Sequence, residues 1–165
     1  MISQERLREL LDYNPDTGEF KWLRDSPSRK RGTVAGTLTE DGYIRIKIEG
    51  CLYRGHRLAF MWMTGVWPEH EVDHSNRVRS DNRWSNLRQA TKAENQRNTV
   101  NRRNGTSGFK GVTFMKRLNK WQAHIYNGGK LNYLGVHQTA ELAARAYAAA
   151  AEKLHGEFAN HAFKI

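Results

Sequence analysis

The sequence predicts an α+β protein with two modules: N-terminal β-hairpins and helices, then a three-stranded antiparallel sheet packed on one helix. Apolar and polar residues alternate over short runs in both halves of the chain, as half-buried strands require. An alanine-rich segment near the C-terminus repeats apolar residues at helical spacing. Residues 101–107 contain no large apolar residue, so we expect domains at 1–100 and 108–165 joined by a basic linker at 101–107.

Basic residues are concentrated in the middle of the chain. The 165 residues carry a formal net charge of +10 and have a sequence pI near 10.0. The segment from Arg77 to Lys120, with both end residues included, contains twelve Lys or Arg and two acidic residues, so it accounts for the whole excess of positive charge. Such a local excess is typical of a surface that binds the phosphates of nucleic acid. A solvated basic face without a ligand is the alternative.

The remaining composition excludes several classes of protein. The single cysteine, Cys51, excludes an internal disulfide and a multi-cysteine zinc site. The longest apolar stretch, around 58–67, is too short for a transmembrane helix, and the first residues form no signal-peptide core. We therefore expect a cytoplasmic protein without a membrane partner.

Caps and turns divide the N-terminal module. Ser3 can cap a helix whose leucines lie on one face, and the turn residues 14–18 are expected to end it. Residues 56–64 are predicted to form a second helix that ends at Gly65, with His56 in a structural role. Alternating residues predict short strands at 20–22, 43–48 and 51–53.

The C-terminal module is predicted to be a meander followed by a helix. Thr139 can cap a helix over 140–155, which Gly156 closes. The many alanines of this helix let it lie close to a sheet. Three short strands, joined by tight turns, are predicted at 109–114, 121–126 and 130–136.

Four polar residues near the end of the first module form a candidate catalytic site. Asp73 and His74 end a predicted strand, Asn86 lies in the following loop, and a Thr-x-x-Glu capping box places Asn95 in the first turn of a helix. A strand, a loop and a helix around one metal ion can make a phosphodiesterase site. Each residue taken singly is also explained as an ordinary turn, surface or helix residue.

The residue types suit phosphodiester hydrolysis, which needs an activated water and stabilisation of charge on the phosphate and the leaving 3′ oxygen. His74 is the one histidine that we assign to this cluster, and a neutral imidazole can take the proton from water near physiological pH. Magnesium binds through one or two carboxylates plus phosphate and water, so one Asp and one Asn suffice.

Residues 52–98 resemble the HNH endonuclease family, in particular the H-N-N branch of phage and intron homing enzymes. The resemblance rests on His56-Arg57-Leu58, Asp73-His74, Asn86-Leu87-Arg88 and the final Asn95 before a helix. It implies a ββα-metal core at about 69–98 and cleavage to a 3′ hydroxyl and a 5′ phosphate.

The same resemblance implies a role for each site residue. Asp73 and Asn95 would hold a divalent metal ion, expected to be Mg²⁺ with Mn²⁺ as a substitute. His74 would be the general base, and Asn86 would fix the loop and orient that histidine. One turn departs from the family pattern, since an apolar residue and then Asn-Gly are replaced by Ser75-Asn76-Arg77. We expect Asn76 to adopt the left-handed conformation and so preserve the turn.

Residues 107–163 resemble an AP2 domain through Gly111-Val112, Lys120-Trp121, the 133–135 strand end and the helix with its following residues to Asn160. The resemblance implies that the three-stranded sheet lies in the major groove of DNA. Trp121 is equally well explained as a core residue, and His124 and Tyr126 share one face by their spacing. The expected contact residues are Lys110, Thr113, Lys116, Arg117, Trp121, His124, Tyr126, Lys130 and Tyr133.

Basic residues of the site loop and the linker are expected to add contacts to DNA. The linker arginines are equally well explained as part of an idle connector. These candidates are Arg77, Arg79, Arg83, Arg88, Arg102 and Arg103.

Together, these features predict a metal-dependent endonuclease, similar to homing endonucleases, that acts on double-stranded DNA in a bacterial or phage-infected cell, associated with the nucleoid. We expect one nicked strand per active site and no obligatory protein partner. The alternative is a non-catalytic, sequence-preferring DNA-binding regulator with a degenerate HNH fold. RNA binding is less favoured because no stacking motif of the common RNA modules occurs.

Overall fold

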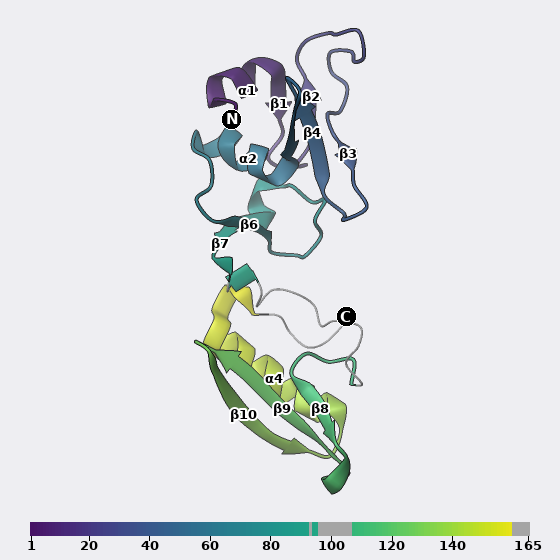
Figure 1. Ribbon diagram of the computed structural model, residues 1–165, viewed down its shortest axis with the longest axis vertical. Coiled ribbons are helices and arrows are strands. Elements are labelled where there is room, and N and C mark those ends of the chain that lie inside the picture. The colour runs from purple at the N-terminus through teal and green to yellow at the C-terminus, as the bar shows by residue number, and fades with distance from the viewer. Residues whose placement is uncertain (93, 96–106, 160–165) are drawn as a thin grey trace. The chain divides into compact units, whose positions relative to one another are not determined.

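The computed structural model describes residues 1–92, 94–95 and 107–159 (Figure 1). Small antiparallel sheets and helices confirm the predicted α+β class. The chain divides into two compact units, Met1–Lys92 and Ala93–Ile165. Within the described ranges, no helix has the length and apolar character needed to cross a membrane.

The first unit begins with helix α1 (Gln4–Leu10), whose N-terminus is capped as predicted: the Ser3 hydroxyl accepts a 3.2 Å hydrogen bond from the backbone N–H of Arg6. The expected end of this helix at 14–18 is wrong. Helix α1 ends at Leu10, and strand β1 (Leu11–Tyr13) follows at once and pairs with β2 (Phe20–Trp22). Asn14 accepts backbone hydrogen bonds at 2.9 and 3.1 Å, so the turn residues close a hairpin rather than a helix.

A second sheet and helix complete the scaffold of this unit. The sheet has the order β3–β4–β5, and helix α2 (Gly55–Thr64) follows it and ends at Gly65, whose φ of 78° suits glycine. Leucines of α1 and α2, Phe20 and the buried side of β4 form one core. The strands are β3 (Thr37–Leu38), β4 (Ile44–Ile48) and β5 (Cys51–Arg54).

The site lies on the last strand pair of the first unit. Strand β6 (Glu71–His74) pairs antiparallel with β7 (Leu87–Ala90), and a short 3₁₀ helix, η1 (Trp84–Asn86), leads into β7. After β7, the described residues 92, 94 and 95 are helical. These elements follow the predicted order of strand, loop, strand and helix.

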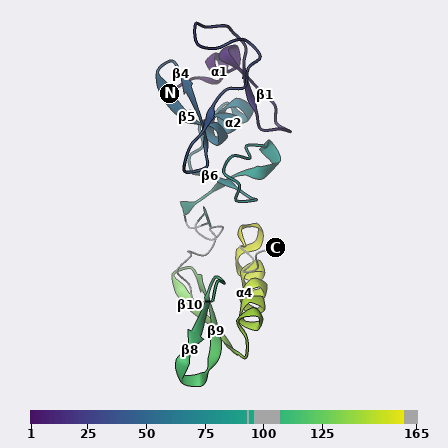
Figure 2. The same cartoon turned by 90° about the vertical axis from the view of Figure 1, so that its right-hand side faces the viewer.

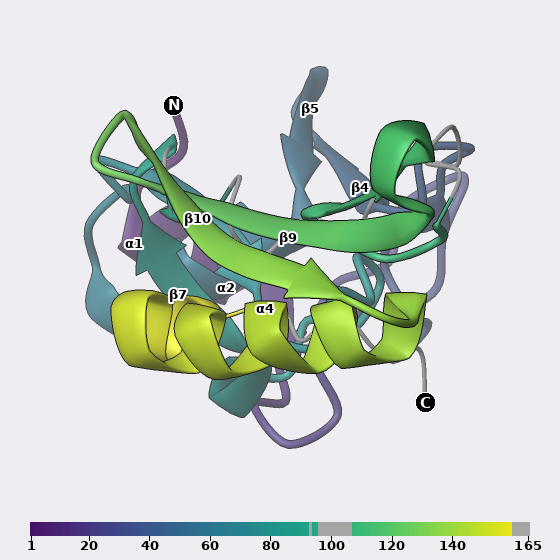
Figure 3. The ribbon, with the colours of Figure 1, turned by 90° about the horizontal axis from the view of Figure 1, so that it is seen from below.

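The second unit is a three-stranded antiparallel sheet, in the order β10–β9–β8, covered on one side by helix α4 (Ala140–His155). Figures 2 and 3 show α4 as a separate layer along β9 and β10. Thr139 caps α4 as predicted, through a 3.3 Å bond to its hydroxyl from the backbone N–H of Leu142. The other elements are β8 (Val112–Met115), η2 (Lys116–Leu118), β9 (Lys120–Asn127), β10 (Lys130–His137) and η3 (Gly156–Phe158).

The first strand of this sheet begins later than predicted. We expected a strand over 109–114, but β8 begins at Val112 because Gly111 has a φ of 69° and turns the chain. A Cβ on Gly111 would lie 2.4 Å from the carbonyl oxygen of His124 and from the Tyr147 ring. The predicted linker 101–107, including Arg102 and Arg103, lies outside the described residues except for Ser107. The domain boundaries therefore stay a prediction.

Candidate active site

Strand β6 carries the two central residues of the site. Asp73 is 7% exposed and His74 is 4% exposed, at the C-terminal end of a strand whose last three residues are all buried. The antiparallel register with β7 places Asp73 opposite Arg88 and His74 opposite Leu87. Both side chains are therefore removed from bulk water. In the protein interior, charges and hydrogen bonds act more strongly than they do in water.

Asp73 is held by Arg88. Two guanidinium nitrogens of Arg88, Nη2 and Nε, lie 2.9 and 3.1 Å from Oδ2 of Asp73. We predicted Arg88 as a contact to DNA, but its guanidinium is directed into the protein, because cross-strand neighbours in the β6–β7 pair meet side by side. The side chains of Arg88 and Asp73 are only 15% and 8% exposed, and removing one partner of a buried ion pair is strongly destabilising.

His74 is surrounded by polar and aromatic side chains. Its Nε2 lies 3.2 Å from the side-chain oxygen of Asn82, and its ring stands edge-on to His56, with ring centroids 5.0 Å apart and an 80° angle between planes. The ring of Tyr43 lies 6.0 Å away. Burial lowers the pKa of His74 despite the opposing effect of its hydrogen bond to the side-chain oxygen of Asn82, so the imidazole is neutral at physiological pH.

The assignment of a single histidine to this cluster is wrong. His56, on the first turn of α2, lies against His74, although the two are far apart in sequence. Burial, with smaller effects from the neighbouring His74, Arg54 and Arg57, lowers the pKa of His56 to about 3. Its Nδ1 has no hydrogen-bond partner among the described residues. Sequence spacing gave no signal for this contact, because the packing of α2 on β6 creates it.

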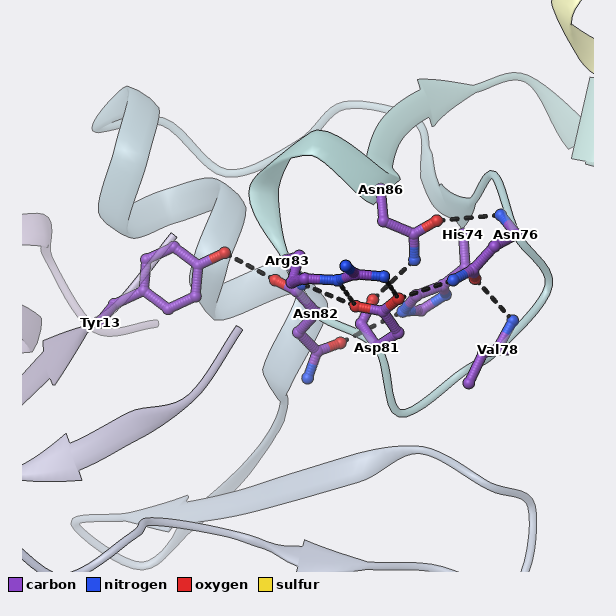
Figure 4. Close-up of polar contacts among 8 residues, drawn as sticks. All are labelled: Tyr13, His74, Asn76, Val78, Asp81, Asn82, Arg83 and Asn86. Atoms are coloured by element: carbon purple, nitrogen blue, oxygen red, sulfur yellow. Dashed lines mark hydrogen bonds and ion pairs between the residues drawn. The ribbon is translucent and has the colours of Figure 1, made fainter. Parts of the chain in front are cut away.

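Asn86 organises the loop between β6 and β7, as Figure 4 shows. Its side-chain oxygen accepts a 2.9 Å bond from the backbone N–H of Asn76, and its side-chain nitrogen donates a 2.7 Å bond to the carbonyl of Asp81. The ring of His74 is instead bonded by Asn82, so the expected orienting contact is made by a different asparagine. Asn82 lies in the run Asp81-Asn82-Arg83 of the loop, but no sequence pattern marked it as a partner of His74.

A second set of bonds closes the same loop around Asp81. The side chain of Asn76 donates a 2.6 Å bond to Asp81, and Arg83 binds the same carboxylate through Nε and Nη2 at 2.8 and 2.6 Å. The hydrogen bond from Arg83 lowers the pKa of Asp81 to about 2. Arg83, which we predicted to contact DNA, therefore already has an acidic partner in the protein.

The glycine-preferring turn is formed differently from our expectation. Arg77 itself has a φ of 66°, whereas Asn76 is not among the residues with positive φ. The backbone N–H of Arg77 donates a 2.8 Å bond to the carbonyl of His74, which closes the turn directly after the site. A left-handed conformation is costly for a residue with a Cβ. The family-like turn is thus preserved at Arg77, and the expectation for Asn76 is wrong.

Two arginines share the ring of Tyr43 beside the site. The guanidinium carbon of Arg54 lies 4.4 Å from the ring centroid, and that of Arg79 lies 5.1 Å from it. Arg79 also donates a 2.9 Å bond to the carbonyl of Asp41. Both arginines are exposed, so their charges are available to an anion near His74, and only Arg79 was predicted from sequence.

Asn95 is helical and half-buried, and it belongs to the second compact unit. Its pairing with Asp73 around a metal ion stays a prediction. Within the described part of the chain, no group of three or more His, Cys, Asp or Glu side chains is placed to hold a metal ion.

The second unit presents one open sheet face. Ala123 and Ile125 of β9 are buried against α4, so the alternating residues His124 and Tyr126 face away from it. Their rings lie 6.5 Å apart, which confirms that they share a face, and His124 pairs across the strands with Tyr133.

The other predicted contact residues of this unit differ in exposure. Trp121 is half-buried and packs against the core cluster, as the core alternative expects. Lys110 is half-buried. Exposed candidates are Thr113, Lys116, Arg117, Tyr126, Lys130 and Tyr133.

Comparison with known proteins confirms both resemblances. Residues 53–97 match the model of the HNH endonuclease family. Over 63 residues the chain is 46% identical to the AP2-like ethylene-responsive transcription factor TOE2 of Arabidopsis thaliana and 44% identical to APETALA2-like protein 2 of Oryza sativa subspecies indica. These matches cover 38% of this chain but only 13% and 14% of the two relatives.

One solved structure is also similar. It describes DNA binding and cleavage by the HNH homing endonuclease I-HmuI, with 26% identity and a TM-score of 0.42, over 54% of this chain and 51% of that one.

Proposed function

We propose that this protein is a metal-dependent DNA endonuclease that hydrolyses phosphodiester bonds, with His74 as the general base. The observation that carries the proposal is the adjacent pair Asp73 and His74, both buried at the end of β6 inside the segment that matches the HNH endonuclease family. A buried carboxylate beside a neutral imidazole combines a site for a cation with a proton acceptor.

The proposed proton acceptor is His74. A general base has to reach only the attacking water, at hydrogen-bond distance, so a small exposed edge of the ring is sufficient. The lowered pKa of His74 keeps its lone pair available at neutral pH. The histidine then takes the proton from water as the water attacks phosphorus.

The proposed metal ligands are Asp73 and Asn95. The donor set fits a hard divalent ion, because Asp73 is a buried carboxylate and the amide of Asn95 supplies a second oxygen. The carboxylate of Asp73 already faces a cation, since Arg88 lies 2.9 Å from it. When bound there, Mg²⁺ or Mn²⁺ would supply positive charge to the phosphate and the leaving oxygen. Arg88 would have to give up its contact with Asp73, or share it.

The second unit is proposed to hold double-stranded DNA through the sheet face that carries His124, Tyr126 and Tyr133. This face is free of the helix that covers the other side of the sheet, and alternating side chains on a sheet can reach the base edges of the major groove. Binding there would raise the local concentration of the nuclease at its target. One active site per chain would nick one strand at a time, and we expect the protein to act in the cytoplasm.

A non-catalytic DNA-binding regulator is the second candidate. Two observations favour it: Arg77 stands in a turn that prefers glycine, and Arg88 occupies the carboxylate of Asp73. Such a protein would bind DNA and never cut it, with either metal.

The test is the relaxation of supercoiled plasmid by the full chain with Mg²⁺ or Mn²⁺. His74→Gln and Asp73→Asn preserve side-chain size, and each is expected to lower nicking by about 100-fold or more while DNA binding persists. His70→Gln, which changes an exposed histidine before β6, serves as the matched control. Unchanged nicking in the site variants contradicts the nuclease assignment, and a wild-type protein that shifts DNA but never nicks it favours the regulator.

A further inference from the structure

We infer that Asn82 is a positioning residue that fixes both the orientation and the tautomer of His74. The inference rests on the proposed function of His74 as the general base. Asn82 is only 2% exposed, and its side-chain oxygen lies 3.2 Å from Nε2 of His74 (Figure 4).

The chemistry of an amide determines the tautomer. An amide oxygen only accepts hydrogen bonds, so its contact with Nε2 requires the proton of the neutral ring to be on that nitrogen. The lone pair is then on Nδ1, which becomes the basic nitrogen. A neutral imidazole has two tautomers, and this contact favours the one whose lone pair is on Nδ1.

The backbone of Asn82 is itself held by the N-terminal hairpin. The hydroxyl of Tyr13, on β1, donates a 2.6 Å bond to the carbonyl of Asn82. Burial raises the pKa of Tyr13, so this hydroxyl stays protonated and remains a donor. The backbone N–H of Trp84 donates a 2.9 Å bond to the carbonyl of Pro15, which ties the loop to the hairpin turn a second time.

Two glycines allow the close approach. A Cβ on Gly18 would lie 2.5 Å from the carbonyl carbon of Asn82, and a Cβ on Gly55 would lie 2.7 Å from its side-chain nitrogen. No other residue fits at either position without displacing Asn82. The β1–β2 hairpin and the start of α2 thus form a socket for this side chain, and Tyr13 and Gly18 of that socket lie outside the matched family segment 53–97.

The two buried asparagines of the loop have different tasks. The side chain of Asn86 bonds to backbone atoms of Asn76 and Asp81, so it shapes the loop. The side chain of Asn82 contacts the imidazole. In metal sites, a partner that orients a ligating histidine typically contributes 10- to 100-fold to metal affinity or activity, and we expect an effect of similar size from Asn82 on His74.

The test compares Asn82→Asp with Asn82→Leu in the full chain. Asp retains an acceptor oxygen at the same place, whereas Leu has a similar size and no acceptor. Nitrogen-15 NMR of the histidine side chains reports which ring nitrogen of His74 is protonated, independently of DNA cleavage. We expect Nε2–H in the wild type and in Asn82→Asp, and a mixture of tautomers in Asn82→Leu.

Kinetics supply the second readout. Asn82→Leu is expected to lower kcat for nicking by about 100-fold with KM within about twofold, and Asn82→Asp to restore most of the activity. An unchanged tautomer in Asn82→Leu, or unchanged kcat in a protein that nicks DNA, overturns the inference. If the wild type does not nick DNA at all, the proposed function fails, and the NMR comparison alone decides whether Asn82 sets the tautomer.

Tyr13→Phe covers the case in which Asn82→Leu does not fold. This variant keeps the aromatic ring in the core and removes only the donor to the carbonyl of Asn82. We expect a partial loss of the Nε2–H tautomer and a kcat lowered by roughly 10-fold. A Tyr13→Phe protein with the wild-type tautomer and kcat would contradict the claim that the β1–β2 hairpin holds Asn82 in place for its contact with His74.

Discussion

Arg88 lies directly opposite Asp73 in the β6–β7 pair, and its guanidinium contacts the carboxylate at 2.9 Å. The proposed metal ligand therefore already has a cation partner in the protein. A divalent ion bound at Asp73, as proposed, would compete with Arg88 for this carboxylate, so the ion pair would affect how tightly the free protein holds a metal.

Arg88→Met is expected to destabilise the protein by about 3 kcal/mol without metal, because it removes the cation that is paired with a buried carboxylate. Mn²⁺ should restore much of this loss, since a ligand that binds only the folded state stabilises it. Thermal unfolding with and without Mn²⁺ measures both effects. Arg88→Lys, which keeps the charge, should show a smaller response, and equal metal responses in all three proteins would contradict the competition.

Arg77→Gly is expected to stabilise the protein by about 1 kcal/mol, because glycine adopts the left-handed conformation at φ 66° without steric cost. Arg77→Ala removes the same charge and side-chain contacts but keeps the Cβ, so it should give no gain. Urea unfolding of the two variants isolates the backbone effect. A glycine variant no more stable than the alanine variant would argue against strain at this turn.

His56 makes stability depend on pH. Burial lowers the pKa of His56 in the folded protein to about 3 from its ordinary value of 6.5. Between these values the unfolded chain binds a proton at His56 that the folded protein does not, so the free energy of unfolding falls as pH falls. The loss is about 1.4 kcal/mol for each pH unit below 6.5.

His56→Gln should reduce that pH dependence by the equivalent of one proton. Denaturant unfolding of the variant and the wild type across this pH range gives the two slopes. The slope that remains in His56→Gln reflects other groups, including His74, whose pKa is also lowered. Identical slopes would mean that His56 is protonated in the folded protein.

Gly111→Ala is expected to destabilise the second unit by roughly 3 kcal/mol. The new Cβ would meet backbone of His124 and the ring of Tyr147 at 2.4 Å, and φ is 69°. Gly128→Ala is the matched control, because its φ is also positive, at 56°, but no described atom lies within 4 Å of the added Cβ. Hydrogen exchange of the β8–β10 amides measures the difference, and equal protection in both variants would rule out the close packing.

Exposed cations of the second unit should contribute to DNA affinity through phosphates. Arg117→Gln and Lys130→Gln are each expected to weaken binding for all sequences and to reduce the salt slope of log K by about 1. Arg6→Gln is the control, since Arg6 is already paired with Glu9 and Glu49. Binding titrations at several salt concentrations measure these slopes. Equal slopes for all proteins would show that Arg117 and Lys130 do not contact DNA phosphates.

Prediction from sequence succeeded where the determinants are local. Ser3 and Thr139 cap their helices as expected, because an N-cap hydroxyl and the N–H groups it binds lie within three residues. The end of α1 was misplaced, because the leucine spacing does not distinguish the last helical turn from the first residues of β1. Pairing with β2 decided between the two.

The site shows the same division. The sequence by itself determined the α+β class, the candidate residues Asp73, His74 and Asn86 and their order along strand and loop, because turns, caps and motif spacing are properties of neighbouring residues. Only the tertiary structure decided that Arg88 faces Asp73, that His56 lies against His74 and that Asn82 holds the ring. These contacts depend on strand register and on the packing of α2 and the β1–β2 hairpin, which join residues far apart in the chain through burial rather than through sequence spacing.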